Sequence, residues 1–346
     1  MGGVDLRALA ITVAIGTLGG ALFKWLTVPL PWMLGALCFT TAAAMRGAAI
    51  VMPRDLRNGF VTILGVMLGA GFTPAVLARI DQWAITLAGL VVWAAVAGAL
   101  AYVYFRRVPG YDRTTAFFAA TPGGLAEMTL VGGRMGGDVR VLSLTHAIRV
   151  MATVLIIPIW FRLEGLIGAA SPGALVGLLD VSPRDYAVLG ACAIFGALLG
   201  VKLRLPAATM LGPMALSAAV HLAGFSEAQP PYVLTAAAQV VLGCAIGQRF
   251  AGATLGGIAR TVGHALAVTA IMLGLAIGFA AVLARASGEP FSALVLTYAP
   301  GGFAEMSLVA LALGADTALV ASHHLFRIAF VVSLAPWLFG RLGGRS

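Results

Sequence analysis

Apolar runs of about 20 residues alternate with short polar links along the whole chain, and a helix of that length crosses the ~30 Å hydrocarbon core of a bilayer. The pattern therefore predicts an all-α polytopic membrane protein with about 10–12 transmembrane segments. The expected segments are residues 6–23, 32–45, 59–77, 83–105, 114–131, 138–161, 186–203, 208–223, 232–250, 261–283, 291–313 and 316–338.

The second half of the chain repeats the plan of the first half. Matched residues keep an offset of 177 or 178 positions through six segments, as in Met33 and Met210, Gly65 and Gly243, Asp138 and Asp316, and Pro158 and Pro336. We expect a first membrane repeat in residues 1–168, a linker in residues 169–184 and a second repeat in residues 185–346.

The basic residues of the links predict that the two repeats are inverted. In the first repeat, Lys and Arg concentrate in the links after segments two and four, whereas in the second repeat they concentrate after segments one and three. Links rich in Lys and Arg remain on the cytoplasmic side of a membrane. Inversion requires an odd number of crossings per repeat, so one segment should be re-entrant, and the short residues 32–45 are one candidate.

Composition supports a membrane protein and argues against nucleic-acid binding. The chain is 60% hydrophobic and only 10% charged, whereas a soluble domain carries about 25% charged residues. The net charge of +9 lies mostly in short links, so it predicts membrane orientation and no nucleic-acid partner. Three isolated cysteines have no metal or disulfide spacing. We expect no cofactor and no metal site.

Two copies of one motif interrupt the apolar pattern: Thr121-Pro122-Gly123-Gly124-Leu-Ala-Glu127-Met and Ala299-Pro300-Gly301-Gly302-Phe-Ala-Glu305-Met. Proline lacks an N–H and clashes with the preceding turn, so the helix should open at each copy. We expect Thr121 to cap the second half-helix, with Pro122 at its first position. Broken helices in matching places of two repeats indicate a transporter binding site, where freed N–H groups bind anions and freed carbonyls bind cations. A plain proline kink is the alternative.

Charged residues accompany each break inside the apolar runs. A charge at mid-membrane costs about 2.5–3.5 kcal/mol, so Glu127 and Glu305 should be protonated, paired or bound to a cation. Arg149 and Arg327 each follow by 11 residues the Asp that begins their helix, or about 16 Å, which places them near the midplane. We expect Glu–Arg pairing around a polar cavity, with a purely structural ion pair as the alternative.

Histidines complete the candidate site. His146 and His324 precede the two arginines by three residues, so each His shares a helix face with its Arg; ordinary hydrogen-bonded packing is the alternative. Asp138 and Asp316 are expected to be helix N-caps. The predicted substrate- or ion-binding residues are Thr121, Pro122, Gly123, Gly124, Glu127, His146, Arg149, Pro300, Gly301, Gly302, Glu305, His324 and Arg327.

The doubled Pro-Gly-Gly-x-Ala-Glu-Met motif and the His-x-x-Arg helices resemble the AbrB-type bacterial inner-membrane proteins, which carry two AbrB duplication repeats. The resemblance covers nearly the whole chain and implies a multi-pass protein of the bacterial inner membrane. That family has been labelled both a regulator of gene expression and a putative ammonia monooxygenase.

A remoter similarity links the motif to the bile-acid/sodium symporter family. It implies inverted repeats, two unwound helices that cross at the midplane, and movement of a core domain against a panel domain. The Ser-Asn that follows the symporter motif is Glu305-Met306 in this chain. The exchange favours coupling to protons over coupling to sodium.

These observations predict a secondary active transporter, rather than an enzyme, that moves a small anionic solute by alternating access with proton coupling. Glu127 and Glu305 would bind the proton, Arg149 and Arg327 would hold the anion, and the expected partners are the lipid bilayer and the solute or ion. A homodimer remains open. A membrane sensor or regulator that binds a ligand without transport is the alternative, and a metal-dependent membrane monooxygenase is the third reading.

Overall fold

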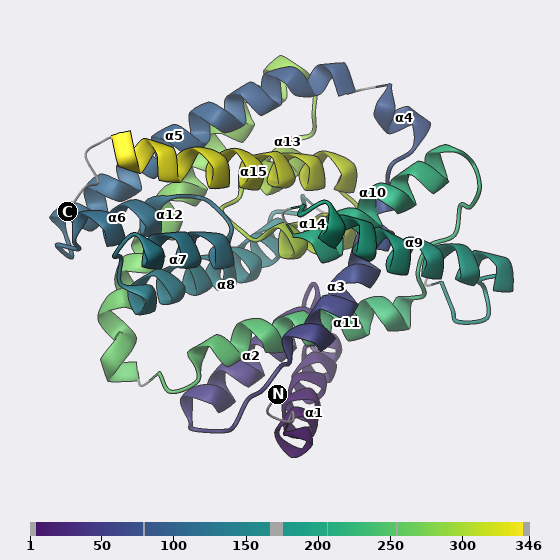
Figure 1. Cartoon of the computed structure of the whole chain (residues 1–346), viewed down its shortest axis with the longest axis horizontal. Coiled ribbons are helices and arrows are strands. Elements are labelled where there is room, and N and C mark those ends of the chain that lie inside the picture. The colour runs from purple at the N-terminus through teal and green to yellow at the C-terminus, as the bar shows by residue number, and fades with distance from the viewer. Residues whose placement is uncertain (1–4, 79, 167–175, 206, 254, 342–346) are drawn as a thin grey trace. The chain divides into compact units, whose positions relative to one another are not determined.

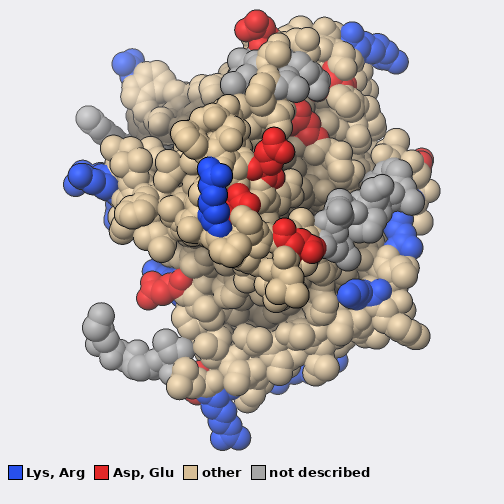
Figure 2. All heavy atoms as spheres, turned by 90° about the vertical axis from the view of Figure 1, so that its right-hand side faces the viewer, with Lys and Arg blue, Asp and Glu red and all other residues tan. Residues whose placement is uncertain are grey.

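The computed structural model describes residues 5–78, 80–166, 176–205, 207–253 and 255–341, and they form helices without strands (Figure 1). Most of the face in Figure 2 carries neither acidic nor basic side chains. The predicted all-α architecture is confirmed. The expected boundary between the first repeat and the linker, at residues 168 and 169, lies outside the described residues.

Among the described helices, seven are long and apolar enough to cross a membrane, which makes the chain a multi-pass membrane protein. They are α1 (Leu6–Trp25), α5 (Trp83–Arg107), α8 (Val139–Leu163), α9 (Pro183–Lys202), α11 (Tyr232–Gly247) with its 3-10 extension η2 (Gln248–Phe250), α12 (Leu255–Ser287) and α15 (Thr317–Arg341).

The other predicted segments are short or broken helices. The short ones are α2 (Pro31–Met45), α3 (Arg54–Gly69) and α10 (Ala208–Leu222), and the turns α4 (Pro74–Leu77) and η1 (Ile80–Gln82) follow α3. The prediction for residues 59–77 was wrong at both ends, because α3 begins at Arg54 and ends at Gly69. Pro53 precedes it with a φ of −60°, and Asp55 lies in the first turn, where a carboxylate stabilises a helix N-terminus.

The helices group into two compact units, and each unit takes segments from both expected repeats. The first unit consists of Met1–Ile80, Pro158–Ala253 and Ser307–Ala318, and the second of Asp81–Ile157, Thr254–Met306 and Leu319–Ser346. The compact units therefore do not coincide with the repeats read from the sequence.

Within the first unit, one helix from each repeat packs against a pair of helices from the other repeat. Helix α2 lies against α1 and α11, and α10 lies against α9 and α3 (Figure 1). A Cβ atom on Gly65 of α3 would collide with the carbonyl oxygen of Met210, and one on Gly243 of α11 with that of Met33. The two contacts occupy matching positions of the repeats, and in both a missing side chain permits close helix approach.

The entries to the short helices α2 and α10 share an unusual backbone. Thr27 and Leu30 have φ values of 54° and 50°, and Arg204 and Ala207 have φ values of 53° and 47°. The left-handed conformation costs roughly 1–2 kcal/mol in a residue that carries a Cβ atom, so it persists only where the surrounding structure fixes it. Its recurrence at an offset of 177 residues identifies these turns as part of the repeated fold.

In the second unit, α5 packs against α12 and lies beside the short helix α6 (Arg113–Ala120). Helix α8 begins as predicted, because the Asp138 carboxylate accepts hydrogen bonds from the backbone N–H groups of Arg140 at 2.8 Å and Val141 at 3.1 Å. This N-cap satisfies two donors that have no partner inside the helix. Asp138 therefore begins the helix that carries His146 and Arg149.

Close packing of α3 on α10 predicts unequal effects for two glycines of one helix. Gly65→Ala should destabilise the protein by about 1–3 kcal/mol, because the new methyl group must displace backbone. Gly59→Ala should be neutral or stabilise by up to about 1 kcal/mol, because nothing lies within 4 Å of its Cβ position. Thermal unfolding of the purified protein measures both, and equal midpoints would contradict the packing described.

Candidate functional site

Both motif copies break a helix, as the sequence predicts. Helix α6 ends at Ala120 and α7 (Leu125–Arg134) begins five residues later, so the four residues 121–124 between them are not helical. Helix α13 (Phe291–Tyr298) and α14 (Phe303–Ala312) flank the matching gap at residues 299–302. The half-helices have equal lengths in the two copies, so the break is part of the repeated fold and is more than a proline kink.

The capping at the first break differs from the prediction. Thr121 ends α6 instead of capping α7: its backbone is extended, with a φ of −69° and a ψ of 123°, and its hydroxyl donates back to the Phe117 carbonyl at 2.7 Å. Gly124 is the N-cap of α7 and offers no side chain to the first N–H groups. The helix restarts only after Gly124, so these N–H groups remain available to another acceptor.

Arg149 satisfies the carbonyl groups that the first break frees. Its Nη1 donates to the Thr121 carbonyl at 3.1 Å and its Nη2 to the Gly123 carbonyl at 3.0 Å, and the residue is only 2% exposed. The two bonds use the fork geometry of the guanidinium. One side chain of α8 thereby fixes the open backbone between α6 and α7.

Arg327 makes the same arrangement at the second break. It donates to the carbonyl oxygens of Ala299 at 2.6 Å and Gly301 at 2.7 Å, and it too is 2% exposed. The predicted Glu–Arg pairing was therefore wrong: within the described chain, the bonds of both guanidinium groups go to main-chain carbonyls and to one histidine. The dipoles of the carbonyl groups freed by the helix break provide the negative partner that a carboxylate was expected to supply.

The two glutamates instead lie over the starts of their own half-helices. Glu127 is the third residue of α7, and its Oε2 occupies the space that a Cβ atom on Gly124 would need. Glu305 stands in the same relation to Gly302. A carboxylate in the first turn interacts favourably with the helix dipole, and this position matches the acidic half of a capping box. The helix N-terminus therefore replaces Arg as the electrostatic partner of each Glu.

The histidines divide into different roles. His324 accepts a hydrogen bond at Nδ1 from Arg327 Nη2 at 3.0 Å, and its Nε2–H donates to the Leu296 carbonyl at 2.9 Å, a tautomer inferred from these partners. It therefore orients Arg327 toward the break. His146 is fully buried on α8.

The structure brings Thr121, Pro122, Gly123, Glu127 and Arg149 together at the first break, and their counterparts at the second.

Sequence reasoning missed a buried polar cluster beside the second break. The Arg327 guanidinium lies 5.9 Å from the ring of Trp93, whose own ring packs edge-on against Tyr298. The Tyr298 hydroxyl donates to the Thr86 carbonyl at 2.6 Å, and the Thr86 hydroxyl lies 2.8 Å from His323 Nε2. Apart from Arg327, these polar and aromatic residues have no counterparts of the same type in the other repeat. That difference between the repeats is the sequence signal that could have revealed the cluster.

A second missed feature does follow the repeat. Thr129 and Ser307 stand two residues after the two glutamates, at an offset of 178 residues. Their hydroxyl groups are buried and have no hydrogen-bond partner among the described residues. A hydroxyl at the same place in both half-helices is a further candidate ligand for a polar solute.

Comparisons with known proteins agree on one relationship. Residues 32–343 match the protein family described as "Transition state regulatory protein AbrB". The "Uncharacterized protein YhjN" of Bacillus subtilis is 27% identical over 94% of this chain and 90% of its own length. The "Putative regulator AbrB" of Escherichia coli is 26% identical over 96% of this chain and 93% of its own length. The similarity therefore includes both broken helices.

The guanidinium bonds predict that Arg327 cannot be replaced by another cation. In Arg327→Lys a single ammonium group cannot bond both carbonyls in the geometry of the fork, and one buried carbonyl left unpaired costs about 1–3 kcal/mol. The thermal unfolding midpoint should fall, whereas that of Arg285→Lys, at an exposed position of α12, should not change. A lysine variant as stable as the wild type would show that the bonds do not support the break.

Proposed function

The chain belongs to the family described as transition state regulatory protein AbrB, and we propose that it is a secondary active transporter of a small anionic solute. In this proposal the protein acts without enzymatic chemistry and resides in the inner membrane of a bacterium. The solute binds at the two broken helices, and protons carried by Glu127 and Glu305 are coupled to its movement. Alternating access exposes the site first to one side of the membrane and then to the other.

The observation that carries the proposal is the position of the glutamates over the half-helix N-termini. The N–H groups at the start of α7 and α14 form an anion site, and the Glu127 and Glu305 side chains lie against the N-cap glycines of these same ends. A negatively charged Glu and a solute anion would repel each other there. Protonation of the Glu removes that repulsion, so proton and anion would bind together.

The arginines supply a second element of an anion site. Each guanidinium uses its two Nη atoms on the carbonyls of its break, while the buried Nε–H of both Arg149 and Arg327 has no hydrogen-bond partner among the described groups. A donor that is buried without a partner is destabilising. A bound carboxylate or other oxyanion would satisfy it, and the positive charge would favour that ligand.

The repeated architecture supports movement between two states. Discontinuous helices in matching repeats are typical of transporters that bind solute near the midplane and alternate by rigid-body motion. The breaks, the arginines and the glutamates of both repeats all belong to the second compact unit. A transport cycle in which this unit carries the solute requires no rearrangement inside the breaks.

The name of the Escherichia coli relative, "Putative regulator AbrB", favours a second candidate function. In that case the same site would bind an anion and report its presence without moving it. Both functions require a ligand at the breaks. Only transport requires flux of the ligand across a sealed membrane.

Coupling through the glutamates predicts a pH-linked phenotype. Small carboxylates and inorganic oxyanions that raise the thermal unfolding midpoint of the purified protein would be tested for uptake into proteoliposomes under an imposed pH gradient. Glu127→Gln and Glu305→Gln each imitate the protonated state of one glutamate, so each should bind the anion with a weaker pH dependence than the wild type and lose at least about tenfold in gradient-driven uptake, equivalent to about 1.4 kcal/mol.

Glu227→Gln is the matched control, because Glu227 lies exposed in the link before α11. It should retain both the pH dependence of binding and the gradient-driven uptake. Anion binding by the wild type without any flux would favour the sensor. Flux that remains fully gradient-driven in both Gln variants would exclude the proposed role of the glutamates.

A further inference from the structure

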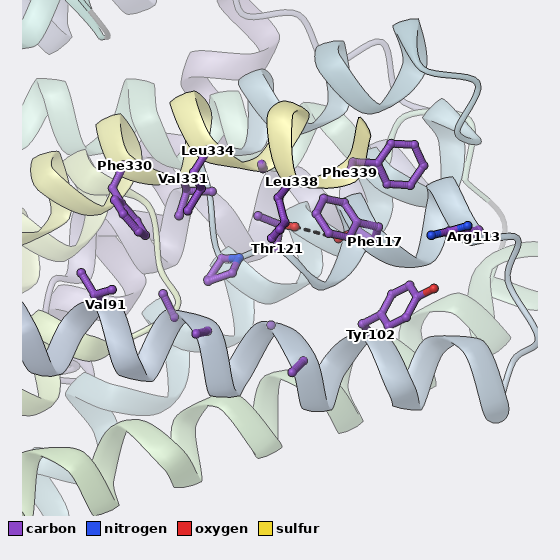
Figure 3. A pocket seen from close by; sticks show the side chains of 16 residues that line it. Val91, Tyr102, Arg113, Phe117, Thr121, Phe330, Val331, Leu334, Leu338 and Phe339 are labelled. Atoms are coloured by element: carbon purple, nitrogen blue, oxygen red, sulfur yellow. Dashed lines mark hydrogen bonds between the residues drawn. The ribbon is translucent and has the colours of Figure 1, made fainter. Parts of the chain in front are cut away.

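An apolar groove of about 550 Å³ opens in the second unit between α5, α6 and α15 (Figure 3). One wall is α5, where the lining residues Ala94, Ala95, Gly98 and Ala99 are all small. The facing wall on α15 carries large side chains such as Phe330 and Leu334. The groove exists because the small residues of α5 leave space that the larger side chains of α15 do not fill.

The groove has the length of one lipid chain. Its lining extends along α5 from Val91 to Tyr102, which are 11 residues apart, or about 16 Å along a helix. Half of the ~30 Å hydrocarbon core is about 15 Å, the depth that the acyl chain of one leaflet occupies. Ala95 and Ala99 remain exposed, so the groove is open along its side. An extended, flexible apolar chain fits this shape better than a compact solute does.

The polar groups of the groove gather at one end. Figure 3 shows Tyr102 and Arg113 together at the end farthest from Val91 and Phe330. Arg113 is exposed and begins α6, and Arg106 and Arg107 end α5 in the same link. This link is one of those that the positive-inside rule assigns to the cytoplasmic face, where anionic lipids attract basic side chains by about 1 kcal/mol per residue.

The repeated fold does not require this polar end. The positions that match Tyr102 and Arg113 at an offset of 178 residues are Ala280 and Phe291, which offer neither a hydroxyl nor a positive charge. The breaks, by contrast, are alike in the two repeats. The cationic end therefore serves a purpose particular to the first repeat, as a ligand bound on that side alone would require.

We propose that the groove holds one acyl chain of an anionic phospholipid, with the lipid phosphate against the Arg113 guanidinium and the Tyr102 hydroxyl. The proposal goes beyond transport and does not depend on it. Thr121 and Pro122 of the first break also line the groove. The bound chain therefore lies against two residues of the break, where its apolar methylene groups keep water away.

Native mass spectrometry of the full chain tests the proposal with phosphatidylglycerol and phosphatidylcholine of identical acyl chains. The wild type should retain one phosphatidylglycerol, with an affinity at least about tenfold above that for phosphatidylcholine. Arg113→Gln should remove most of this headgroup preference, with Arg106 and Arg107 left to supply the remainder. Gly98→Leu should abolish retention of both lipids, because its Cβ position lies 3.8 Å from Pro122 and leaves the leucine room to enter the groove.

Two control variants separate the groove from general effects. Gly278→Leu adds the same side chain at an open position of α12, and Arg140→Gln removes an exposed charge from α8; both should retain the lipid as the wild type does. Equal retention of the two lipids by the wild type would overturn the proposal. So would a Gly98→Leu protein that keeps its lipid but loses solute uptake, because the groove would then belong to the solute.

Discussion

The hydrogen bonds from one buried guanidinium to two main-chain carbonyls are the interaction on which each broken helix depends. Open backbone at membrane depth is tolerated only where protein or a wet cavity satisfies it, because each unpaired group costs several kcal/mol. Arg149 and Arg327 meet that demand from the neighbouring helices α8 and α15. Because carbonyl dipoles stabilise these cations, the two glutamates are not needed as counterions and can serve another purpose.

Much of this arrangement could be predicted from the sequence, because it follows from local rules. Pro-Gly-Gly opens a helix wherever it occurs, and Asp138 caps one for the same reason in any context. The partner of Arg149 could not be predicted. The depth of a guanidinium follows from its position along a helix, but whether it meets a carboxylate or a carbonyl depends on how α8 lies against residues 26 and 28 positions earlier.

Some features of the structure occur in only one of the two repeats, and matched residues could not predict them. Thr86, Trp93, Tyr298 and His323 form a buried polar cluster at the second break alone, and a search for matched residues passes over them. The basic end of the apolar groove is likewise confined to one repeat. Two copies of one fold have thus acquired different surroundings.

The exchange of helices between the repeats governs how the chain can be made. Helix α11 of the second repeat covers the close packing surface of α2, and α3 of the first repeat covers that of α10. Neither repeat therefore completes the packing of its own short helix. During synthesis α2 must remain in the membrane with its partner missing until nearly two hundred further residues have been inserted. A repeat expressed alone would therefore leave the close packing surface of its short helix uncovered.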